Sequence, residues 1–244
     1  MNIILKAVDL KKSYNGKCVL DINNLEIEMG KITAIIGPSG VGKTTLLSLI
    51  NGIEKPDGGK IIFEGEEFSF ANSYSKDTIK KMAMVFQKPV MFNTSVYKNI
   101  AYGLKIRGIE KEKIHARISE AASWIGISDI LKQKAMTLSG GEAGRVSVAR
   151  AMIIKPDLLL MDEPTANLDP ANVSIIEGMV LKACKEYGAT VIIVTHNMFQ
   201  ARRIADNIVF MLGGQVIENG PVASMFESPF DKRTQAFISG NMVY

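Results

Sequence analysis

The chain has 244 residues, of which 47% are hydrophobic and 22% are charged, a balance that excludes extensive disorder and suits one large domain or two small ones. Its formal net charge of +4 comes without a long basic cluster, so charge gives no reason to expect nucleic-acid binding. The 2 cysteines form no CxxC pair, which argues against a cysteine metal site. No apolar run approaches the ~18 residues of a membrane span, so the chain would reach a membrane only by docking on a partner there.

Residues 1–30 alternate apolar and polar positions, and this alternation predicts antiparallel strands. Later runs are short, uniformly apolar and bounded by Gly, Pro or Asp, which is typical of strands buried on both faces of a parallel sheet. Such strands are expected at 32–37, 81–86, 157–162, 190–195 and 207–212. Helical patterns alternate with them at about 43–51, 140–154, 170–186 and 197–203. The order predicts an α/β fold with a mostly parallel sheet and an N-terminal antiparallel β subdomain.

A helical insert is expected at 95–136, because amphipathic segments such as "EKIHARISEAASWIGI" follow one another there. Short helices are expected in the tail at 221–244. We therefore predict a single domain over residues 1–244. Its core comprises 1–90 and 155–244, and a helical subdomain spans about 91–154.

A glycine-rich loop follows the expected strand at 32–37 and opens the helix at 43–51. Its sequence "GPSGVGKT" fits the phosphate-binding pattern G-x-x-x-x-G-K-[ST] completely. Glycines let the backbone turn its N–H groups toward phosphate, and the helix dipole adds positive potential. Lys43 can reach the β- and γ-phosphates, and the Thr44 hydroxyl can ligate Mg²⁺. The predicted ATP-binding residues in this segment are Gly37, Pro38, Ser39, Gly40, Val41, Gly42, Lys43, Thr44 and Thr45.

Two adjacent carboxylates, Asp162 and Glu163, follow the apolar run "LLLM". Asp162 is expected at the carboxyl edge of the sheet, where open α/β sheets bind ligands, and it can hold Mg²⁺ through water. Glu163 is expected to point the other way along the pleat and to polarise an attacking water. A plain polar turn would have the same residues, but the phosphate loop upstream favours the catalytic interpretation.

Further segments complete a pattern in order along nearly the whole chain. They are Tyr14, Gln87 in "VFQKP", "LSGGE" followed by Arg145, "NLD" ending at Asp169, and His196 in "VTHN". With these segments the chain resembles the nucleotide-binding subunit of an ABC (ATP-binding cassette) transporter, a P-loop NTPase. The "LSGGE" run together with both phosphate-site motifs is highly specific to that family. The resemblance implies ATP and Mg²⁺ as cofactors.

The resemblance also implies a role for each segment. Tyr14 would stack on adenine, and the catalytic residues would be Glu163, His196 and Gln87. The metal ligands would be Thr44, Gln87 and Asp162. The signature residues would act on the ATP of a partner protomer, and they are Leu138, Ser139, Gly140, Gly141 and Glu142. Asp169 would lie in the D-loop, which crosses the same interface, so a homodimer is expected.

Taken singly, some of these residues allow plainer interpretations. Tyr14 can be an ordinary strand-edge tyrosine, and Gln87 can be a solvated loop residue. "SGG" also suits a simple helix start with Ser139 as N-cap, as Asp169 suits the next helix. Gly144 departs from the usual family pattern and costs roughly 1 kcal/mol relative to alanine inside a helix, which would soften the signature helix.

A single cassette without a membrane span is expected to be a peripheral subunit at the cytoplasmic face of the cell membrane. It would bind integral membrane permease subunits directly and an extracytoplasmic anion-binding protein indirectly, with no nucleic acid as partner. The apolar segment after Gln87 would receive the permease. Met91, Phe92 and Val96 in that segment suit either this contact or the core of the helical insert.

The runs "EPTANLDPAN" and "DKRTQAFISGN" resemble those of tungstate and phosphate importer ATPases. The expected function is therefore ATP hydrolysis that drives uptake of an oxyanion, with tungstate as the expected cargo. Phosphate import is one alternative, and a soluble ABC ATPase switch without a transporter is another. A small-molecule P-loop kinase is a third, which "LSGGE" disfavours because a kinase needs no phosphate clamp from a second subunit.

Overall fold

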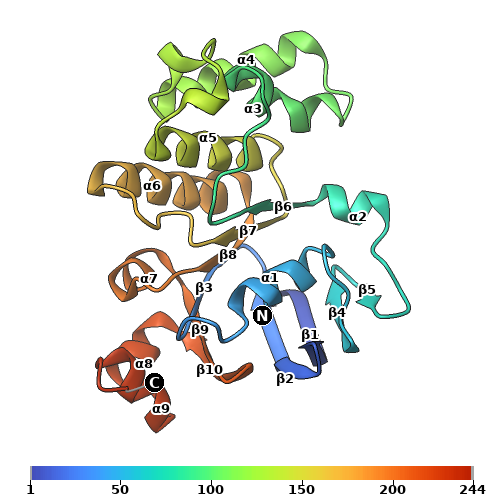
Figure 1. The fold of residues 1–244 in the computed structure, drawn as a ribbon, viewed down its shortest axis with the longest axis vertical. Helices are drawn as coiled ribbons and strands as arrows, with labels where there is room; N and C mark the ends of the chain where they lie inside the picture. Colours follow the sequence, from blue (N-terminus) through green and yellow to red (C-terminus); the bar gives the residue numbers. More distant parts are fainter. Residues whose placement is uncertain (1, 243–244) are drawn as a thin grey trace.

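Two β-sheets organise the chain in the computed structural model, which describes residues 2–242 (Figure 1). The antiparallel sheet has the order β2 (Lys17–Glu28), β1 (Ile3–Tyr14), β4 (Gly58–Phe63) and β5 (Glu66–Ser69). The second sheet has the order β10 (Gln215–Pro221), β9 (Asn207–Leu212), β3 (Ile32–Ile36), β8 (Thr190–Val194), β7 (Leu158–Asp162) and β6 (Met82–Val85). All neighbours in the second sheet are parallel except β10 and β9. The predicted α/β fold with a mostly parallel sheet and an antiparallel N-terminal part is confirmed.

The parallel strands bring their carboxyl ends to one edge of the sheet. Every residue of β3, β7 and β8 is buried, as expected for strands covered on both faces. In the register, Val194 of β8 lies opposite both Ile35 of β3 and Asp162 of β7. The segments that follow these three strands therefore start side by side.

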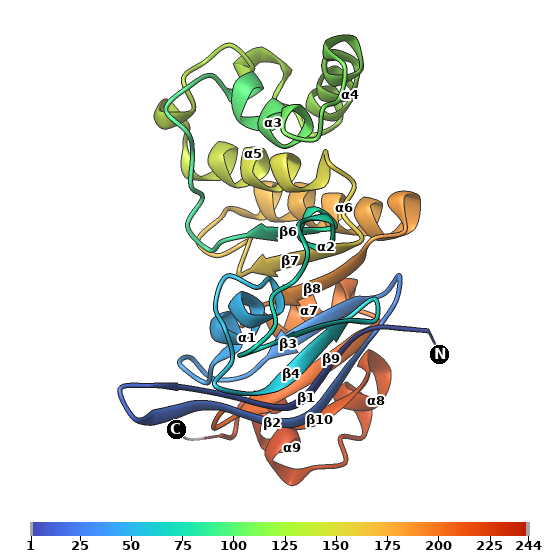
Figure 2. The same cartoon turned by 90° about the vertical axis from the view of Figure 1, so that its right-hand side faces the viewer.

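The helices lie in layers on this sheet. They are α1 (Lys43–Ile50), α2 (Lys76–Lys80), α3 (Val96–Lys105), α4 (Lys111–Trp124), α5 (Gly140–Met152), α6 (Pro170–Tyr187), α7 (Met198–Ile204), α8 (Val222–Glu227) and α9 (Lys232–Ile238). Figures 1 and 2 place α3 and α4 at one end of the molecule, with α5 and α6 between them and the sheet. The antiparallel sheet, α8 and α9 lie toward the opposite end. The division into a core and a helical subdomain at about 91–154 stays a prediction. No helix within residues 2–242 is long and apolar enough to cross a membrane.

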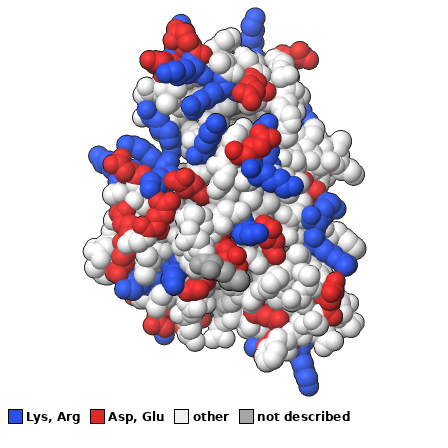
Figure 3. Space-filling model, turned by 180° about the vertical axis from the view of Figure 1, so that it is seen from behind, with Lys and Arg blue, Asp and Glu red and all other residues white. Residues whose placement is uncertain are grey.

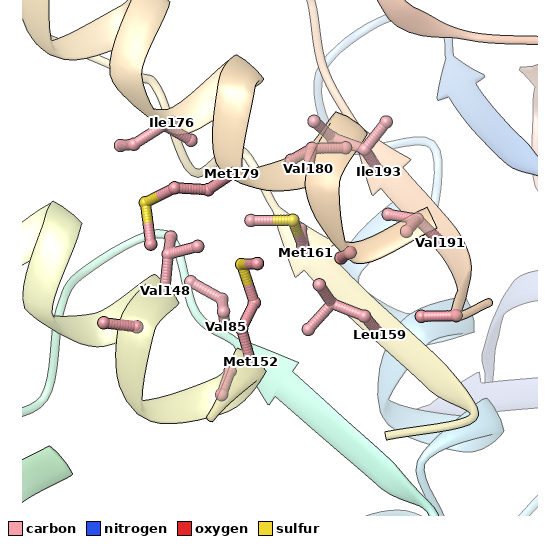
Figure 4. Close-up of a cluster of buried hydrophobic side chains, with 14 of the residues drawn as sticks. Val85, Val148, Met152, Leu159, Met161, Ile176, Met179, Val180, Val191 and Ile193 are labelled. Carbon is pink, nitrogen blue, oxygen red and sulfur yellow. The ribbon is translucent and has the colours of Figure 1, made fainter. Parts of the chain in front are cut away.

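Buried side chains join α5 and α6 to the sheet (Figure 4). The labelled ones are Val148 and Met152 from α5, Ile176, Met179 and Val180 from α6, and Val85, Leu159, Met161, Val191 and Ile193 from the strands. Full burial of such a side chain contributes about 1.5–3 kcal/mol. This packing fixes the position of the N-termini of α5 and α6, where "LSGGE" and Asp169 lie.

Several elements escaped sequence analysis. The hairpin of β4 and β5 turns at Glu64 and Gly65, whose φ values are +49° and +83°. Two left-handed residues in succession make the tight turn typical of hairpins, but glutamate is not one of the residues that usually signals it. The short helix α2 and the edge strand β10 were also not predicted.

Of the two alternatives for Val96, a permease contact or the core of the helical insert, the structure supports the core. This residue is 0% exposed at the start of α3, so a contact between Val96 and a membrane partner is wrong. Met91 is partly buried against the same core, whereas Phe92 is 43% exposed. Only Phe92 of the three remains well placed for an external contact.

Candidate nucleotide site

The phosphate loop joins β3 to α1 and needs its glycines for steric reasons. Gly37 has a φ of +148°, and a Cβ there would lie 2.2 Å from the carbonyl oxygen of Met211. Gly42 has a φ of +97°, and a Cβ there would lie 2.6 Å from a methyl of Leu20. Within residues 2–242 no side chain caps the N-terminus of α1. The first amides of α1 are therefore suited to hydrogen-bond an anion.

Lys43 folds back onto the loop that precedes it. Its Nζ donates to the carbonyl oxygens of Gly37 and Pro38, both at 2.7 Å. Burial lowers the pKa of Lys43, while the negative charges of Glu163 and Asp162 act in the opposite direction. The ammonium group therefore sits in a buried position where a phosphate would be a strong additional partner.

Thr44 and Asp162 meet beside this lysine. The Thr44 hydroxyl donates to Oδ2 of Asp162 at 2.7 Å, and Asp162 is 5% exposed. Burial raises the pKa of Asp162, and the hydrogen bond from Thr44 partly opposes that effect. The pair offers hard oxygen ligands of the kind that Mg²⁺ prefers.

A single pocket of about 310 Å³ connects the loop to the carboxylates. It is lined by Val19, Ser39, Gly40, Gly42, Lys43, Thr44, Thr45, Gln87, Asp162, Glu163 and Val194. Val19 of β2 was missed by sequence analysis, since an isolated valine in an alternating strand carries no functional signal. Val41 is not among the lining residues and instead packs against the core.

Glu163 leaves the strand rather than continuing it. Its φ is +44°, and its amide donates to the carbonyl of Val194 at 3.0 Å. The expectation that Glu163 simply alternates with Asp162 along the pleat is therefore wrong, because β7 ends at Asp162. A left-handed glutamate is uncommon, and it turns this carboxylate into the pocket at the sheet edge.

His196 follows β8 and contacts this carboxylate. Nδ1 of His196 lies 2.6 Å from Oε2 of Glu163. Because an ionised carboxylate only accepts hydrogen bonds, Nδ1 is the donor in this pair. Glu163 also lines a second pocket, together with His196 and residues 165–168, so it stands between the phosphate loop and the "NLD" segment.

Tyr14 lies at the rim of the site. Its side chain is 40% exposed, its hydroxyl donates to Glu54, and Nζ of Lys12 lies 5.4 Å from the ring centroid. Burial raises the pKa of Tyr14, and the hydrogen bond to Glu54 adds to the effect. The ring does not line the 310 Å³ pocket.

The "LSGGE" segment is organised as a helix start on a different part of the surface. Ser139 caps α5, with Oγ accepting from the amide of Glu142 at 3.4 Å, and Oε2 of Glu142 accepting from the amide of Ser139 at 2.8 Å. The expected N-cap is present and forms a full capping box. Leu138 packs against the core. None of the predicted signature residues lines the pocket around Lys43.

Asp169 caps α6 as expected, with Pro170 at the first helical position and Oδ1 accepting from the amide of Asn172 at 3.0 Å. A Cβ at Gly144 would lie 3.4 Å from a methyl of Leu168 and 3.6 Å from a methyl of Ile176, which are ordinary van der Waals distances, so packing alone does not require glycine there. That Gly144 softens the signature helix stays a prediction.

Comparisons with known proteins agree with this architecture. The ABC transporter family model matches residues 20–166. The tungstate uptake system ATP-binding protein TupC of Peptoclostridium acidaminophilum is 46% identical over 210 residues, which cover 86% of this chain and 95% of that protein. The phosphate import ATP-binding protein PstB 2 of Natronomonas pharaonis is 41% identical over 250 residues, covering 98% and 88%.

A solved structure of an ATP-binding cassette has the same fold as this chain. The ATP-binding cassette MJ0796, in a dimeric post-hydrolysis state bound to ADP and Pi, has a TM-score of 0.80 at 27% identity, covering 89% of this chain and 98% of that one. The resemblance predicted from the sequence motifs is confirmed, and ATP hydrolysis with it. The chain therefore belongs to the ABC transporter family, in which it is an ATP-binding ATPase.

Proposed function

We propose that the chain hydrolyses ATP as the peripheral subunit of an ABC importer for an oxyanion, and that this oxyanion is tungstate. The observation that carries the proposal is the convergence of Lys43, Asp162 and Glu163 in one pocket at the carboxyl edge of the sheet. The 46% identity to a relative named as a tungstate uptake protein supports the choice of cargo.

In this proposal the loop amides and Lys43 bind the ATP phosphates. Lys43 would exchange its two carbonyl partners for the β- and γ-phosphate oxygens, which are stronger partners for a buried ammonium. Tyr14 would stack on adenine at the open rim, where its ring is accessible. The other predicted contacts come from the rest of the segment Gly37 to Thr45. The residues of this segment that line the pocket are Ser39, Gly40, Gly42, Lys43, Thr44 and Thr45, whereas Gly37, Pro38 and Val41 do not line it.

The hard oxygens of Thr44 and Asp162 fit Mg²⁺, and the Gln87 side chain lines the same pocket. These three residues would hold the ion. When bound, Mg²⁺ neutralises charge on the β- and γ-phosphate oxygens.

Glu163 would accept a proton from the attacking water, or hold that water in line with the γ-phosphate. Its Oε2 is engaged by Nδ1 of His196 at 2.6 Å, so Oε1 is the atom assigned to the water. His196 would fix the orientation of the carboxylate through Nδ1 and would sense the γ-phosphate from its place beside the pocket.

We also propose that two copies of the chain sandwich ATP. The predicted signature residues do not reach the chain's own pocket, although Ser139 and the glycines form a second helix start suited to phosphate. A partner copy would supply them, as the dimeric state of the MJ0796 cassette suggests. Asp169, at the start of α6, would cross the same interface.

The membrane partner would dock on the segment around α3. Large apolar side chains are exposed there, namely Phe86, Val90, Phe92, Tyr102 and Ile106. The rings of Phe92 and Tyr102 lie 4.8 Å apart and present a joint apolar surface. The face of the molecule seen from behind carries acidic and basic side chains intermixed, as solvated surfaces do (Figure 3).

The cargo is tested by elemental analysis of source cells with and without the gene, grown with trace tungstate, molybdate and phosphate. The proposal predicts a selective loss of intracellular tungsten, restored by the wild-type gene and not by one encoding Lys43→Ala. Unchanged tungsten would refute tungstate as cargo.

Phosphate is the second candidate, favoured by a 41% identical phosphate-import relative that aligns with 98% of the chain. A fall in phosphorus with unchanged tungsten would select it. Fractionation of the same cells tests the importer itself. A protein found only in the soluble fraction, with uptake of both elements unchanged, would indicate an ATPase that is not tied to transport.

A further inference from the structure

A side-chain network joins the two segments that we assign to the dimer interface. Nη1 of Arg145, on α5, donates to Oδ1 of Asn172, on α6, at 2.7 Å. Nδ2 of Asn172 donates to Oδ2 of Asp169 at 2.5 Å, and its backbone amide donates to Oδ1 of Asp169 at 3.0 Å. A single amide side chain thus connects the signature helix to the D-loop carboxylate.

The same amide also lies directly against the signature segment. A Cβ at Gly141 would lie 2.4 Å from Nδ2 and 2.7 Å from Cγ of Asn172. Gly141 has no unusual φ and so does not need to be glycine for backbone reasons. A Cβ at Gly141 would therefore force the Asn172 side chain to move away from its hydrogen-bond partners.

Asparagine suits this position chemically. Its oxygen accepts from the cationic Arg145 while its nitrogen donates to the anionic Asp169, which neither aspartate nor leucine can do. Nε of Arg145 is buried without a hydrogen-bond partner among residues 2–242, so the hydrogen bond from Nη1 to Asn172 anchors this guanidinium. Removing the amide would free the Arg145 head group and one oxygen of Asp169 together.

We propose that Asn172 is a positioning residue that locks the signature segment and the D-loop into one unit, so that both reach the partner's ATP in register. This inference rests on the proposed ATP-sandwiched dimer. Asn172 does not line the pocket around Lys43, so its effect would fall on dimer closure and not on nucleotide binding by a single protomer.

The test measures ATP-dependent dimerisation by analytical ultracentrifugation over a range of protein concentrations, in a Glu163→Gln background that retains ATP. Asn172→Ala is expected to weaken the dimer about tenfold, because the Arg145 side chain would then have to be ordered when the dimer forms, at the cost of immobilising about one long side chain. The affinity of the monomer for a fluorescent ATP analogue should not change. With Glu163 intact, ATPase activity should recover as the protein concentration is raised.

The matched control is Asn219→Ala, which removes a hydrogen bond from an exposed asparagine to the carbonyl of Glu26, at 3.4 Å. It should leave dimerisation unchanged. Asn172→Asp keeps the acceptor for Arg145 but sets a carboxylate against Asp169, and it favours helix formation because it lies in the first turn of α6. Asn172→Asp therefore tests the connection between Arg145 and Asp169 even if Asn172→Ala folds poorly. This variant should also weaken the dimer.

Dimerisation of both Asn172 variants at the parental concentration would overturn the inference while leaving the proposed function intact. An equal loss of monomer ATP affinity and of dimerisation would also overturn it, since that pattern indicates general structural damage. If the Glu163→Gln parent itself fails to dimerise with ATP, that result refutes both the proposed dimer and the inference about Asn172.

Discussion

Asn99 holds the segment that carries Phe92, and its removal should destabilise the protein measurably. Asn99 is 0% exposed on α3. Its Oδ1 accepts from the amide of Phe92 at 2.9 Å, and its Nδ2 donates to the carbonyl oxygens of Phe92 and Ser95, both at 3.1 Å. Arg150 of α5 adds a longer contact to Oδ1 at 3.4 Å, and its guanidinium lies 5.3 Å from the ring centroid of Phe92.

The magnitude follows from these contacts. Three hydrogen bonds at about 1 kcal/mol each are lost in Asn99→Ala. The expected loss in the free energy of unfolding is therefore about 2–4 kcal/mol. Urea unfolding followed by circular dichroism measures it directly.

Asn23→Ala is the control, since Asn23 is exposed on β2 and its replacement should change stability by less than about 0.5 kcal/mol. The variant at Asn99 should also make the segment before α3 more sensitive to limited proteolysis. A destabilisation below about 1 kcal/mol, comparable to the control, would refute the view that Asn99 anchors this segment.

Two further predictions concern the phosphate loop and its carboxylate. Gly37→Ala should lower the free energy of unfolding by about 2–4 kcal/mol, because its Cβ would lie 2.2 Å from the Met211 carbonyl oxygen, whereas Gly40→Ala, with nothing within 4 Å of its Cβ, should cost only about 1–2 kcal/mol for its left-handed backbone. Equal losses in the free energy of unfolding for the two variants, measured by urea unfolding, would contradict a steric requirement for glycine at position 37. The raised pKa of Asp162 means that its contribution to stability is present below the ordinary pKa of 3.8 and is lost as pH rises through its folded value. Asp162→Asn should therefore raise the unfolding temperature at pH 7 without nucleotide, with the gain disappearing toward pH 4, while weakening Mg²⁺–ATP binding in a calorimetric titration. A lower unfolding temperature at pH 7 would show that the Asp162 carboxylate is net stabilising.

The sequence predicts the parts of this molecule where local chemistry is decisive. Uniformly apolar runs identify β3, β7 and β8, because only strands buried on both faces tolerate such composition. The phosphate loop is evident because close backbone approach demands glycine at Gly37 and Gly42. The caps at Ser139 and Asp169 follow from the small set of residues that satisfy free helix amides.

The rest depends on contacts between distant segments. The left-handed backbone of Glu163 accompanies its hydrogen bond to Val194, which lies 31 positions along the chain. Glutamate has no preference for this conformation, so the sequence does not predict the turn. Val96 is apolar whether it faces a partner or the core, and only packing decides. Asn172 has no motif of its own, and its role is visible only once Gly141, Arg145 and Asp169 surround it.

The central claim is that Glu163 serves the hydrolysis of ATP bound by Lys43 and its loop. The most direct test compares steady-state ATP hydrolysis and ATP binding by the purified wild-type protein and Glu163→Gln. The account predicts ATP affinity within a few-fold of wild type and a fall in hydrolysis of about 100-fold or more, the size expected for loss of a general base. Hydrolysis near the wild-type rate would contradict the account and remove Glu163 from its centre.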